Sequence, residues 1–288
     1  MTLTRQPVEL KSLDERLKGV LFLPGTGGAF PALIICHGAA DFKENYFELC
    51  ECLAQRGVAA LVIDMHGHGE SEGERFHVNM DQWVADVRAA VEFLSSHPSV
   101  GPSRIGAFGI SSGGTAILEA ALIEPRLRAL VALDATVRNS MPWSFALVLK
   151  ALLFLGSIKK RLTNKDLRLS MLKMMEGTKL AVDPEVDRRL RTNPRAVEAF
   201  KAFPLPGAAQ SFFVNTIERV SRIKIPTLVL WGKEDQLDPP ETAQLLYDAL
   251  ICKKQLHIIP GNGHAGHADQ NRSQVFSLTA NWALENLA

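Results

Sequence analysis

The sequence predicts an α/β fold with a mainly parallel sheet that helices cover on both faces. Two observations predict it. Short, continuous apolar runs alternate with segments of helical periodicity along most of the chain, which is typical of βαβ units. Residue types that carry chemistry directly follow several of these runs, and sheets of this kind bind ligands at the carboxyl ends of their strands.

The expected strands are apolar throughout because a parallel strand is buried on both faces. They cover residues 17–23, 31–38, 58–65, 104–111, 127–136, 226–232 and 255–261. Helical spacing is present at 43–56 and 79–96, from Ser112 to Ile123, and on both sides of the last expected strand. In the 79–96 segment one face carries Trp83, Val87, Ala90, Val91 and Leu94. These elements account for most of the chain outside residues 137–222.

The composition is that of a packed globular protein. The 288 residues are 47% hydrophobic and 22% charged. A net charge of +1, from 32 basic and 31 acidic residues, lacks the basic excess expected of a nucleic-acid-binding chain. Four cysteines without a C-x-x-C pair indicate neither a disulfide scaffold nor a zinc site. Because the first residues hold no continuous apolar stretch, we expect no secretory signal and a cytoplasmic location.

The alternation of strands and helices breaks between residues 137 and 222. This segment has no clear strand pattern, and its 16 basic and 7 acidic residues give it a net charge of +9, against −8 for the remainder. We interpret 137–222 as a helical cap insertion over an active site. Residues 1–136 and 223–288 would then form the catalytic domain.

A nucleophile is predicted at Ser111. Residues 109–113, Gly-Ile-Ser-Ser-Gly, fit the G-x-S-x-G pattern between an expected strand and an expected helix, which is the context that the pattern requires. Its glycines leave room in a tight turn, and the start of the helix favours negative charge that develops beside the serine. The alternative is a Gly/Ser turn without catalytic meaning.

A serine hydroxyl is a weak nucleophile, so it needs a base and an acid that orients the base. Chains whose nucleophile lies in such a G-x-S-x-G turn, called a nucleophile elbow, carry the three groups in the order serine, acid, histidine. Asp235 follows the expected strand 226–232 and is the preferred acid, with Asp238 and Glu234 as weaker candidates. Asp134, at the end of another strand, is a further candidate that we interpret as structural or as a substrate contact.

The base is predicted to be His264. It lies in the Gly-rich loop Pro-Gly-Asn-Gly-His that follows the last expected strand. His267 is a rival because it lies three residues later in the same loop. The base would take the proton of Ser111 and later give it to the leaving group.

The negative oxygen of a tetrahedral intermediate needs backbone N–H donors. One is expected from Ser112, the residue after the nucleophile. The other is expected from Ala39, in the loop His37-Gly38-Ala39-Ala40 that ends the expected strand 31–38. Small side chains there would let the substrate approach the backbone.

These motifs together resemble those of the α/β-hydrolases. The residues that carry the resemblance are His37-Gly38, Asp64-Met65-His66-Gly67-His68-Gly69-Glu70-Ser71-Glu72-Gly73, the Ser111 elbow, Gly232 with Asp235, and Gly263-His264. The second stretch is similar to that of the branch holding monoacylglycerol lipases, cinnamoyl esterases and serine aminopeptidase-like hydrolases. The resemblance covers nearly all of residues 17–287 outside the cap, and it implies an α/β-hydrolase fold, a Ser-His-Asp triad and acyl transfer.

Two features qualify the resemblance. Ile110 stands where some lipase-like relatives have a histidine before the nucleophile, which weakens assignment to the monoacylglycerol lipases. His66 and His68 are interpreted as hydrogen-bonded scaffold residues rather than as catalysts.

The expected cap begins with a strongly apolar stretch, residues 141–158, in which Lys150 is the only charge. It is a poor membrane-spanning candidate because such a helix needs about 20 apolar residues. We interpret it as a buried cap helix that lines an acyl pocket. The alternative is contact with a membrane surface, since Lys159, Lys160 and Arg161 follow directly.

The remaining cap features have simpler interpretations. Residues 188–191, Arg-Arg-Leu-Arg, are expected to form a solvated helical face, with attraction of an anionic substrate as the alternative. Four phenylalanines are expected in the core, or else along the pocket: Phe200, Phe203, Phe212 and Phe213.

The sequence therefore predicts a serine hydrolase that cleaves a carboxylic ester or thioester with an apolar acyl or alcohol group through an acyl-enzyme. The alternatives are a peptidase or carbon–carbon bond hydrolase with the same triad and, from another class, a non-catalytic binding protein. No metal or organic cofactor is expected. The expected partner is a small-molecule substrate and not nucleic acid; peripheral membrane contact through the cap and a homodimer both stay open.

Overall fold

The computed structural model describes residues 3–25, 27–139 and 141–287. Their main feature is an eight-stranded sheet with the order β1-β2-β4-β3-β5-β6-β9-β10. The strands are β1 (Thr4–Ser12), β2 (Glu15–Leu23), β3 (Phe30–Cys36), β4 (Ala59–Ile63), β5 (Val100–Ile110), β6 (Leu127–Leu133), β9 (Thr227–Gly232) and β10 (Lys254–Ile259). From β4 to β10 all neighbours are parallel, whereas β2 is antiparallel to both β1 and β4. The predicted α/β fold with a mainly parallel sheet is confirmed.

Strand β1 is absent from the sequence-based prediction. Most of its side chains are exposed, so its residues show no continuous apolar run. Antiparallel pairing from Thr4 opposite Leu23 to Ser12 opposite Glu15 holds it at the edge of the sheet. An edge strand of an antiparallel pair needs only one buried face, and the apolar-run criterion therefore overlooks it.

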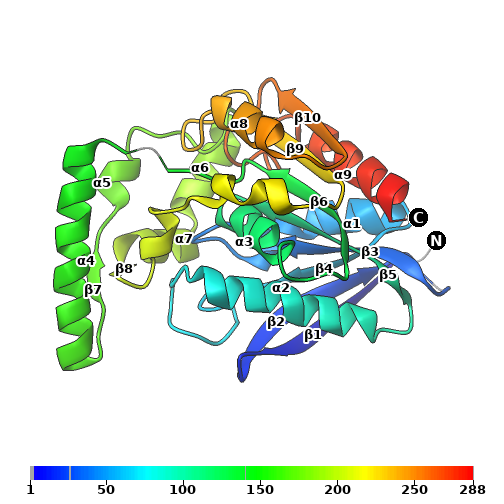
Figure 1. Cartoon of the computed structure of the whole chain (residues 1–288), viewed down its shortest axis with the longest axis horizontal. Helices are drawn as coiled ribbons and strands as arrows, with labels where there is room; N and C mark the ends of the chain where they lie inside the picture. The colour runs from blue at the N-terminus through cyan, green and yellow to red at the C-terminus, as the bar shows by residue number, and fades with distance from the viewer. Residues whose placement is uncertain (1–2, 26, 140, 288) are drawn as a thin grey trace.

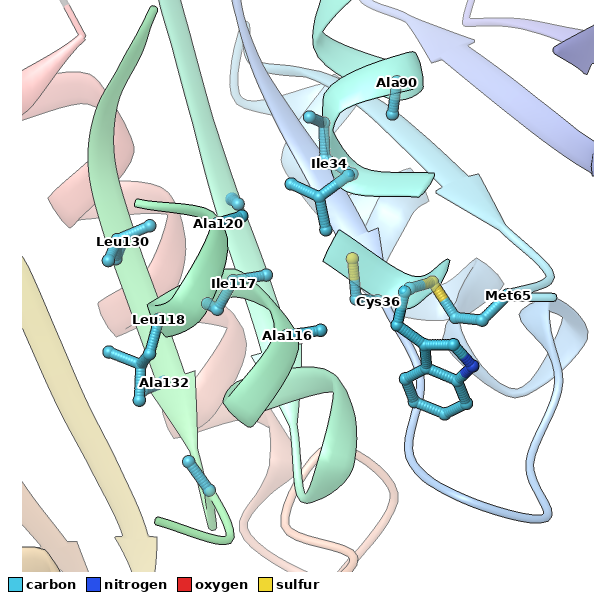
Figure 2. Close-up of a cluster of buried hydrophobic side chains, with 14 of the residues drawn as sticks. Ile34, Cys36, Met65, Ala90, Ala116, Ile117, Leu118, Ala120, Leu130 and Ala132 are labelled. Carbon is cyan, nitrogen blue, oxygen red and sulfur yellow. The ribbon is translucent and has the colours of Figure 1, made fainter. Parts of the chain in front are cut away.

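Helices cover both faces of the sheet (Figure 1). One buried cluster joins the sheet to α2 (Met80–Ser95), α3 (Ser112–Ala120) and α8 (Glu241–Ala249), and a second joins it to α1 (Phe47–Gln55) and α9 (Arg272–Asn286). Successive residues of a strand divide between the clusters: Ile34 belongs to the first and Ile35 to the second. Figure 2 shows part of the first cluster, with side chains of α3 beside Leu130 and Ala132 of β6.

Residues 137–222 follow β6 and precede β9 in the chain. Their helices are α4 (Trp143–Thr163), α5 (Leu172–Met175), α6 (Pro184–Thr192) and α7 (Pro194–Lys201), with short 3-10 turns at Ala209–Ser211, Thr216–Glu218 and Val220–Arg222. The residues here show no strand pattern, yet β7 (Leu167–Leu169) and β8 (Phe203–Leu205) pair into a small antiparallel sheet. Three-residue strands are too short to show a pattern. Where the structure describes it, the segment adds no strand to the eight-stranded sheet.

Helix α4 corrects the prediction of a buried cap helix. It forms the edge of the molecule remote from the two termini (Figure 1). Only Leu149 and Gly156 of the helix are buried, while Trp143 is 80% and Phe154 is 66% exposed. A Cβ atom on Gly156 would lie 2.7 Å from the carbonyl oxygen of Leu205, so the helix packs on β8 along one narrow side. Apolar composition alone therefore misjudged its burial.

Within the described residues, no helix has the length and apolar character needed to cross a membrane.

Candidate active site

Ser111 lies between β5 and α3 at the carboxyl end of the parallel strands. Its backbone has φ 51° and ψ −124°, a conformation that residues other than glycine rarely adopt. A Cβ atom on Gly113 would lie 2.4 Å from the carbonyl oxygen of His37, and one on Gly109 would lie 2.3 Å from that of Gly113. Only glycines permit this close approach of α3 to β3. It holds the serine in a tight turn at the carboxyl end of the sheet.

His264 and Asp235 come from the loops that follow β10 and β9, two neighbouring parallel strands. His264 Nδ1 lies 2.9 Å from Asp235 Oδ2, and both residues are buried. The other oxygen of Asp235 accepts hydrogen bonds from the backbone N–H groups of Leu237, at 2.8 Å, and Asp238, at 3.0 Å. With Nδ1 donating to the carboxylate, Nε2 is left as the ring's acceptor.

The other carboxylates of the prediction have different surroundings. Asp238 accepts a hydrogen bond from the Thr136 hydroxyl at 2.8 Å, and burial raises its pKa to about 6. Asp134 is fully buried and accepts the N–H of Gly232 at 2.7 Å; burial, together with the charge of Asp235, raises its pKa. Glu234 is exposed and accepts the N–H of Gly261. Asp235 is thus the carboxylate that contacts His264.

Three carboxylates govern the proton affinity of His264. Burial by itself would lower the pKa of the imidazole, but Asp235 opposes this by its charge and its hydrogen bond, and Asp238 and Asp134 add further negative charge. Their combined effect raises the pKa of His264 above its usual value. The site therefore favours a positively charged imidazole, the form that arises when a base takes up the proton of a nucleophile.

The hydroxyl of Ser111 contacts a threonine that the sequence did not single out. Ser111 Oγ lies 3.4 Å from Thr136 Oγ1, and Thr136 in turn donates to Asp238. Ser111 and His264 line the same cavity, although the structure shows no hydrogen bond between them. Catalytic hydrogen bonds often form only in the complex with substrate. Because threonines at strand ends are common, no signal marked Thr136 in advance.

The loop after β3 borders Ser111. A Cβ atom on Gly38 would lie 3.2 Å from Cβ of Ser111, and Ala39 lines the cavity. Helix α3 begins at Ser112, whose N–H is therefore among the first four of the helix, which have no partner within it. Both backbone groups expected to bind an oxyanion thus adjoin the serine.

A buried histidine, His68, holds this loop in place. His68 Nε2 accepts the N–H of Ala40 at 3.2 Å, and Ala40 has a positive φ of 60°. Burial lowers the pKa of His68 to about 3, so the ring is neutral and retains this acceptor. His66 bonds to Asp86 through its backbone N–H and its ring. Both residues have the scaffold contacts that their interpretation requires.

A cavity of about 200 Å³ opens beside Ser111. The sheet side contributes Ala39, Ile110 and His264, while residues 180–200 contribute apolar side chains, including Leu190 and Phe200. Of the other phenylalanines, Phe203 is buried against Phe212, at 5.4 Å between ring centroids, and Phe213 is 41% exposed. Phe200 is therefore the one of the four that lines the cavity.

The basic run 188–191 lies on α6. Arg188 pairs with Glu185, and Arg191 pairs with Asp187 at 2.9 Å, while Leu190 between them faces the cavity. Two arginines are thus neutralised by pairs along their own helix, as expected of a solvated face.

A buried aspartate that sequence analysis missed connects the His264 loop to residues 180–183. Asp269 accepts the N–H groups of Val182 and Asp183, at 2.8 and 2.9 Å, and that of Gly263 at 2.8 Å. The N–H of Ala265 also donates to Leu180, at 2.8 Å. The loop that carries His264 is therefore fastened to residues 180–183.

Two groups of described residues have the composition of metal ligands: Glu44 with Asp64 and Glu70, and Glu74 with His77 and Asp166. In each group a neighbouring lysine already contacts the carboxylates. Lys43 bonds to all three carboxylates of the first group, and Lys160 bonds to Glu74 and Asp166 of the second. An ammonium group thus supplies the positive charge at both places.

Comparison with known proteins gives a consistent result. Residues 29–271 match the family model described as "Serine aminopeptidase, S33". The structure of the α/β-hydrolase GrgF from Penicillium sp. sh18 superposes with a TM-score of 0.82 at 19% identity, covering 99% of each chain. This likeness concerns the fold.

Two curated fungal proteins match part of the chain. A polyketide transferase, ATR5, from Stachybotrys chlorohalonatus is 37% identical over 133 residues, which cover 45% of this chain and 44% of that protein. A thiohydrolase, aneE, from Aspergillus aculeatus is 32% identical over 145 residues, which cover 48% and 45%. Each match thus spans less than half of the relative's length.

Proposed function

The chain belongs to the serine aminopeptidase (S33) family of α/β-hydrolases, and from this premise we propose that it hydrolyses a carboxylic ester or thioester through an acyl-enzyme on Ser111. The observation that carries the proposal is the hydrogen bond from His264 to Asp235, because His264 lines the same cavity as Ser111. In this proposal Ser111 is the nucleophile, His264 the base and Asp235 the acid that orients the base.

The proposed first half-reaction forms the acyl-enzyme. Ser111 Oγ attacks the carbonyl carbon while His264 Nε2 takes its proton. The N–H groups of Ala39 and Ser112 hold the negative oxygen of the intermediate. His264 then gives the proton to the leaving alcohol or thiol as the bond between that group and the carbonyl carbon breaks.

The second half-reaction repeats these steps with water. His264 takes a proton from water as its oxygen attacks the acyl carbon, and it returns the proton to Ser111 Oγ when the acid leaves. Asp235 keeps Nδ1 protonated throughout, so that Nε2 always faces the reaction. Apart from the substrate and water, every group named in the proposed steps belongs to this chain.

The cavity supports an apolar acyl or alcohol group. Its wall includes Ile110, Leu180, Leu190, Phe200 and Leu237. Burial of such a group against these side chains contributes roughly 25 cal/mol for each Å² removed from water. A thiohydrolase among the relatives favours a thioester as one of the two bond types.

A peptidase or a carbon–carbon bond hydrolase would use the same groups, and the family description names aminopeptidases. Such an enzyme should cleave aminoacyl amides or diketones faster than esters. A comparison of kcat/KM for matched esters, thioesters and amides separates these activities. A faster amide reaction would overturn the ester proposal but not the role of Ser111.

The nucleophile is tested with a fluorophosphonate probe and mass spectrometry of the labelled peptide. We expect the label on Ser111, and complete loss of labelling and of p-nitrophenyl ester hydrolysis in Ser111→Ala. Ser103→Ala, which changes an exposed serine on β5, the strand before Ser111, is the matched control and should keep both. Failure of the native protein to label would leave a binding protein as the better interpretation.

For α4 we propose contact with an anionic lipid surface. Its exposed large apolar side chains are Trp143, Phe145, Leu147, Val148, Phe154, Leu155, Ile158 and Leu162. Lys150, Lys159 and Arg161 on the same helix are exposed as well, and basic residues beside an apolar face suit anionic headgroups.

Sedimentation with vesicles tests this contact. The protein should bind phosphatidylserine-containing vesicles more strongly than pure phosphatidylcholine ones, and Phe154→Ser with Leu155→Ser should weaken that binding. Equal loss of vesicle binding in Ile251→Ser, an exposed apolar residue far along the chain, would contradict a specific role of α4. A stable dimer that dissociates in the α4 variant would instead assign this face to a second copy of the chain.

A further inference from the structure

His267 forms part of the cavity wall but has no role in the proposed triad. It lies three residues after His264, is 4% exposed, and stacks on Tyr46 with ring centroids 4.3 Å apart and planes 9° apart. Neither ring nitrogen has a hydrogen-bond partner among the residues that the structure describes. A buried polar group without a partner is unfavourable, and in a binding site the ligand commonly supplies the partner.

The surroundings of His267 keep its ring neutral and fixed. Burial lowers its pKa to about 4, so near neutral pH one nitrogen carries a hydrogen and the other is an acceptor. Tyr46, on which the ring stacks, donates its hydroxyl hydrogen to Asp41 at 2.6 Å. Asp41 also accepts the N–H of Phe42 at 2.8 Å, and Asn45 bonds to it as well. Both oxygens of the Asp41 carboxylate thus have hydrogen-bond partners, whereas neither nitrogen of the His267 imidazole has one among the described residues.

The same wall limits what can bind there. Asp41 lines the cavity and repels a carboxylate or phosphate, and a neutral imidazole adds no positive charge to offset this. Most of the remaining wall is apolar. An uncharged oxygen on an otherwise apolar chain avoids repulsion by Asp41 and suits the apolar wall. A hydroxyl can pair with either nitrogen of His267, and a keto oxygen with its N–H.

We propose that His267 is a binding residue for a hydroxyl or keto oxygen on the acyl group of the substrate. This inference rests on the proposed ester or thioester hydrolysis and narrows its substrate class to oxygenated acyl groups. His264 and His267 then have separate tasks in one loop: His264 exchanges protons with the reacting atoms, and His267 selects the chain that is presented to them.

Kinetics with chromogenic esters provide the test. The p-nitrophenyl ester of hexanoic acid is compared with a series that carries one hydroxyl or keto group at successive positions along the chain. For the native protein we expect at least one oxygenated ester to exceed hexanoate in kcat/KM by about threefold to tenfold, the value of one neutral hydrogen bond. In His267→Phe, which keeps an aromatic ring on Tyr46, that preference should vanish while hexanoate is still hydrolysed.

Two further variants sharpen the result. His267→Asn retains a donor and an acceptor and should keep part of the preference. His257→Phe replaces a histidine on β10 that does not line the cavity, and should keep all of it. A native protein without preference for any oxygenated ester, or a preference that survives in His267→Phe, would overturn the proposal.

A binding measurement separates this inference from the proposed function. Calorimetry of Ser111→Ala with N-propylhexanamide and its hydroxylated counterparts requires no turnover. Tighter binding of a hydroxylated amide that is lost when His267→Phe is added upholds the subsite even if the ester activity fails. Equal binding of all amides rejects the subsite, even if Ser111 proves to be the nucleophile and esters are cleaved.

Discussion

Thr136 connects Ser111 to Asp238: its oxygen lies 3.4 Å from Ser111 Oγ, and its hydrogen is donated to Asp238 at 2.8 Å. Because the single hydrogen of Thr136 is used in this way, the Ser111 hydroxyl donates to Thr136 in the resting structure. For Ser111 to act as the proposed nucleophile, its hydroxyl therefore has to turn from Thr136 to His264.

We expect Thr136→Val to leave Ser111 reactive but to make the protein less stable. The valine leaves a buried Asp238 oxygen without its partner, which costs about 1–3 kcal/mol in the free energy of unfolding. Urea denaturation measures this cost, and the rate of fluorophosphonate labelling reports on the serine. Loss of labelling in a folded Thr136→Val protein would show that the threonine is needed to activate Ser111.

The pH dependence of hydrolysis should reveal the carboxylates around His264. The proposed mechanism requires the neutral imidazole, so kcat/KM should rise with pH as His264 loses its proton, at an apparent pKa above the usual histidine value. Asp238→Asn removes one negative charge and should move that rise to lower pH. Glu234→Gln, an exposed neighbour in the same loop, should leave the profile in place. An unchanged or upward-shifted profile in Asp238→Asn would contradict the assignment.

Asp235 and Asp134 can be separated by a matched pair of variants. Asp235→Asn should lower kcat by roughly 10³–10⁴-fold, because the amide no longer favours the reactive tautomer of His264. In Asp134→Asn the amide oxygen can still accept the N–H of Gly232, so we expect less than a tenfold loss. Steady-state kinetics on one ester measures both, and the reverse order of losses would make Asp134 the orienting acid.

The close approach of α3 to β3 predicts the effect of enlarging Gly113. In Gly113→Ala the new Cβ atom would lie 2.4 Å from a backbone oxygen, so the helix must shift, at a cost of about 1–3 kcal/mol. Gly177→Ala, where a Cβ atom would meet nothing within 4 Å, is the control. Thermal unfolding should separate the two, and equal Tm values would mean that α3 adjusts without strain.

Much of this site could be predicted because its residues occupy fixed places relative to strands. Ser111 follows β5, Asp235 follows β9 and His264 follows β10, and parallel strands place their carboxyl ends together. Spacing along the chain therefore carried three-dimensional information. The proximity of Asp235 to His264 follows from the neighbouring positions of β9 and β10.

Other features depend on surroundings that the sequence does not display. Burial of the side chains on α4 could not be judged from composition, because the residue type of an apolar side chain does not tell whether other residues cover it. Thr136 and Asp269 have ordinary residue types, and only their contacts distinguish them. Spacing alone makes His267 a rival base, whereas its stacking on Tyr46 and its place in the cavity wall are visible only in the structure.

Asp269 has a mechanical consequence. It bonds at once to the His264 loop and to the backbone of residues 182–183, so those two parts move as one piece unless its hydrogen bonds break. A molecule that pushes residues 182–183 outward would also move the imidazole of His264 away from Ser111. Poorly fitting substrates would then be rejected because the proposed catalytic groups separate, as well as by weak binding.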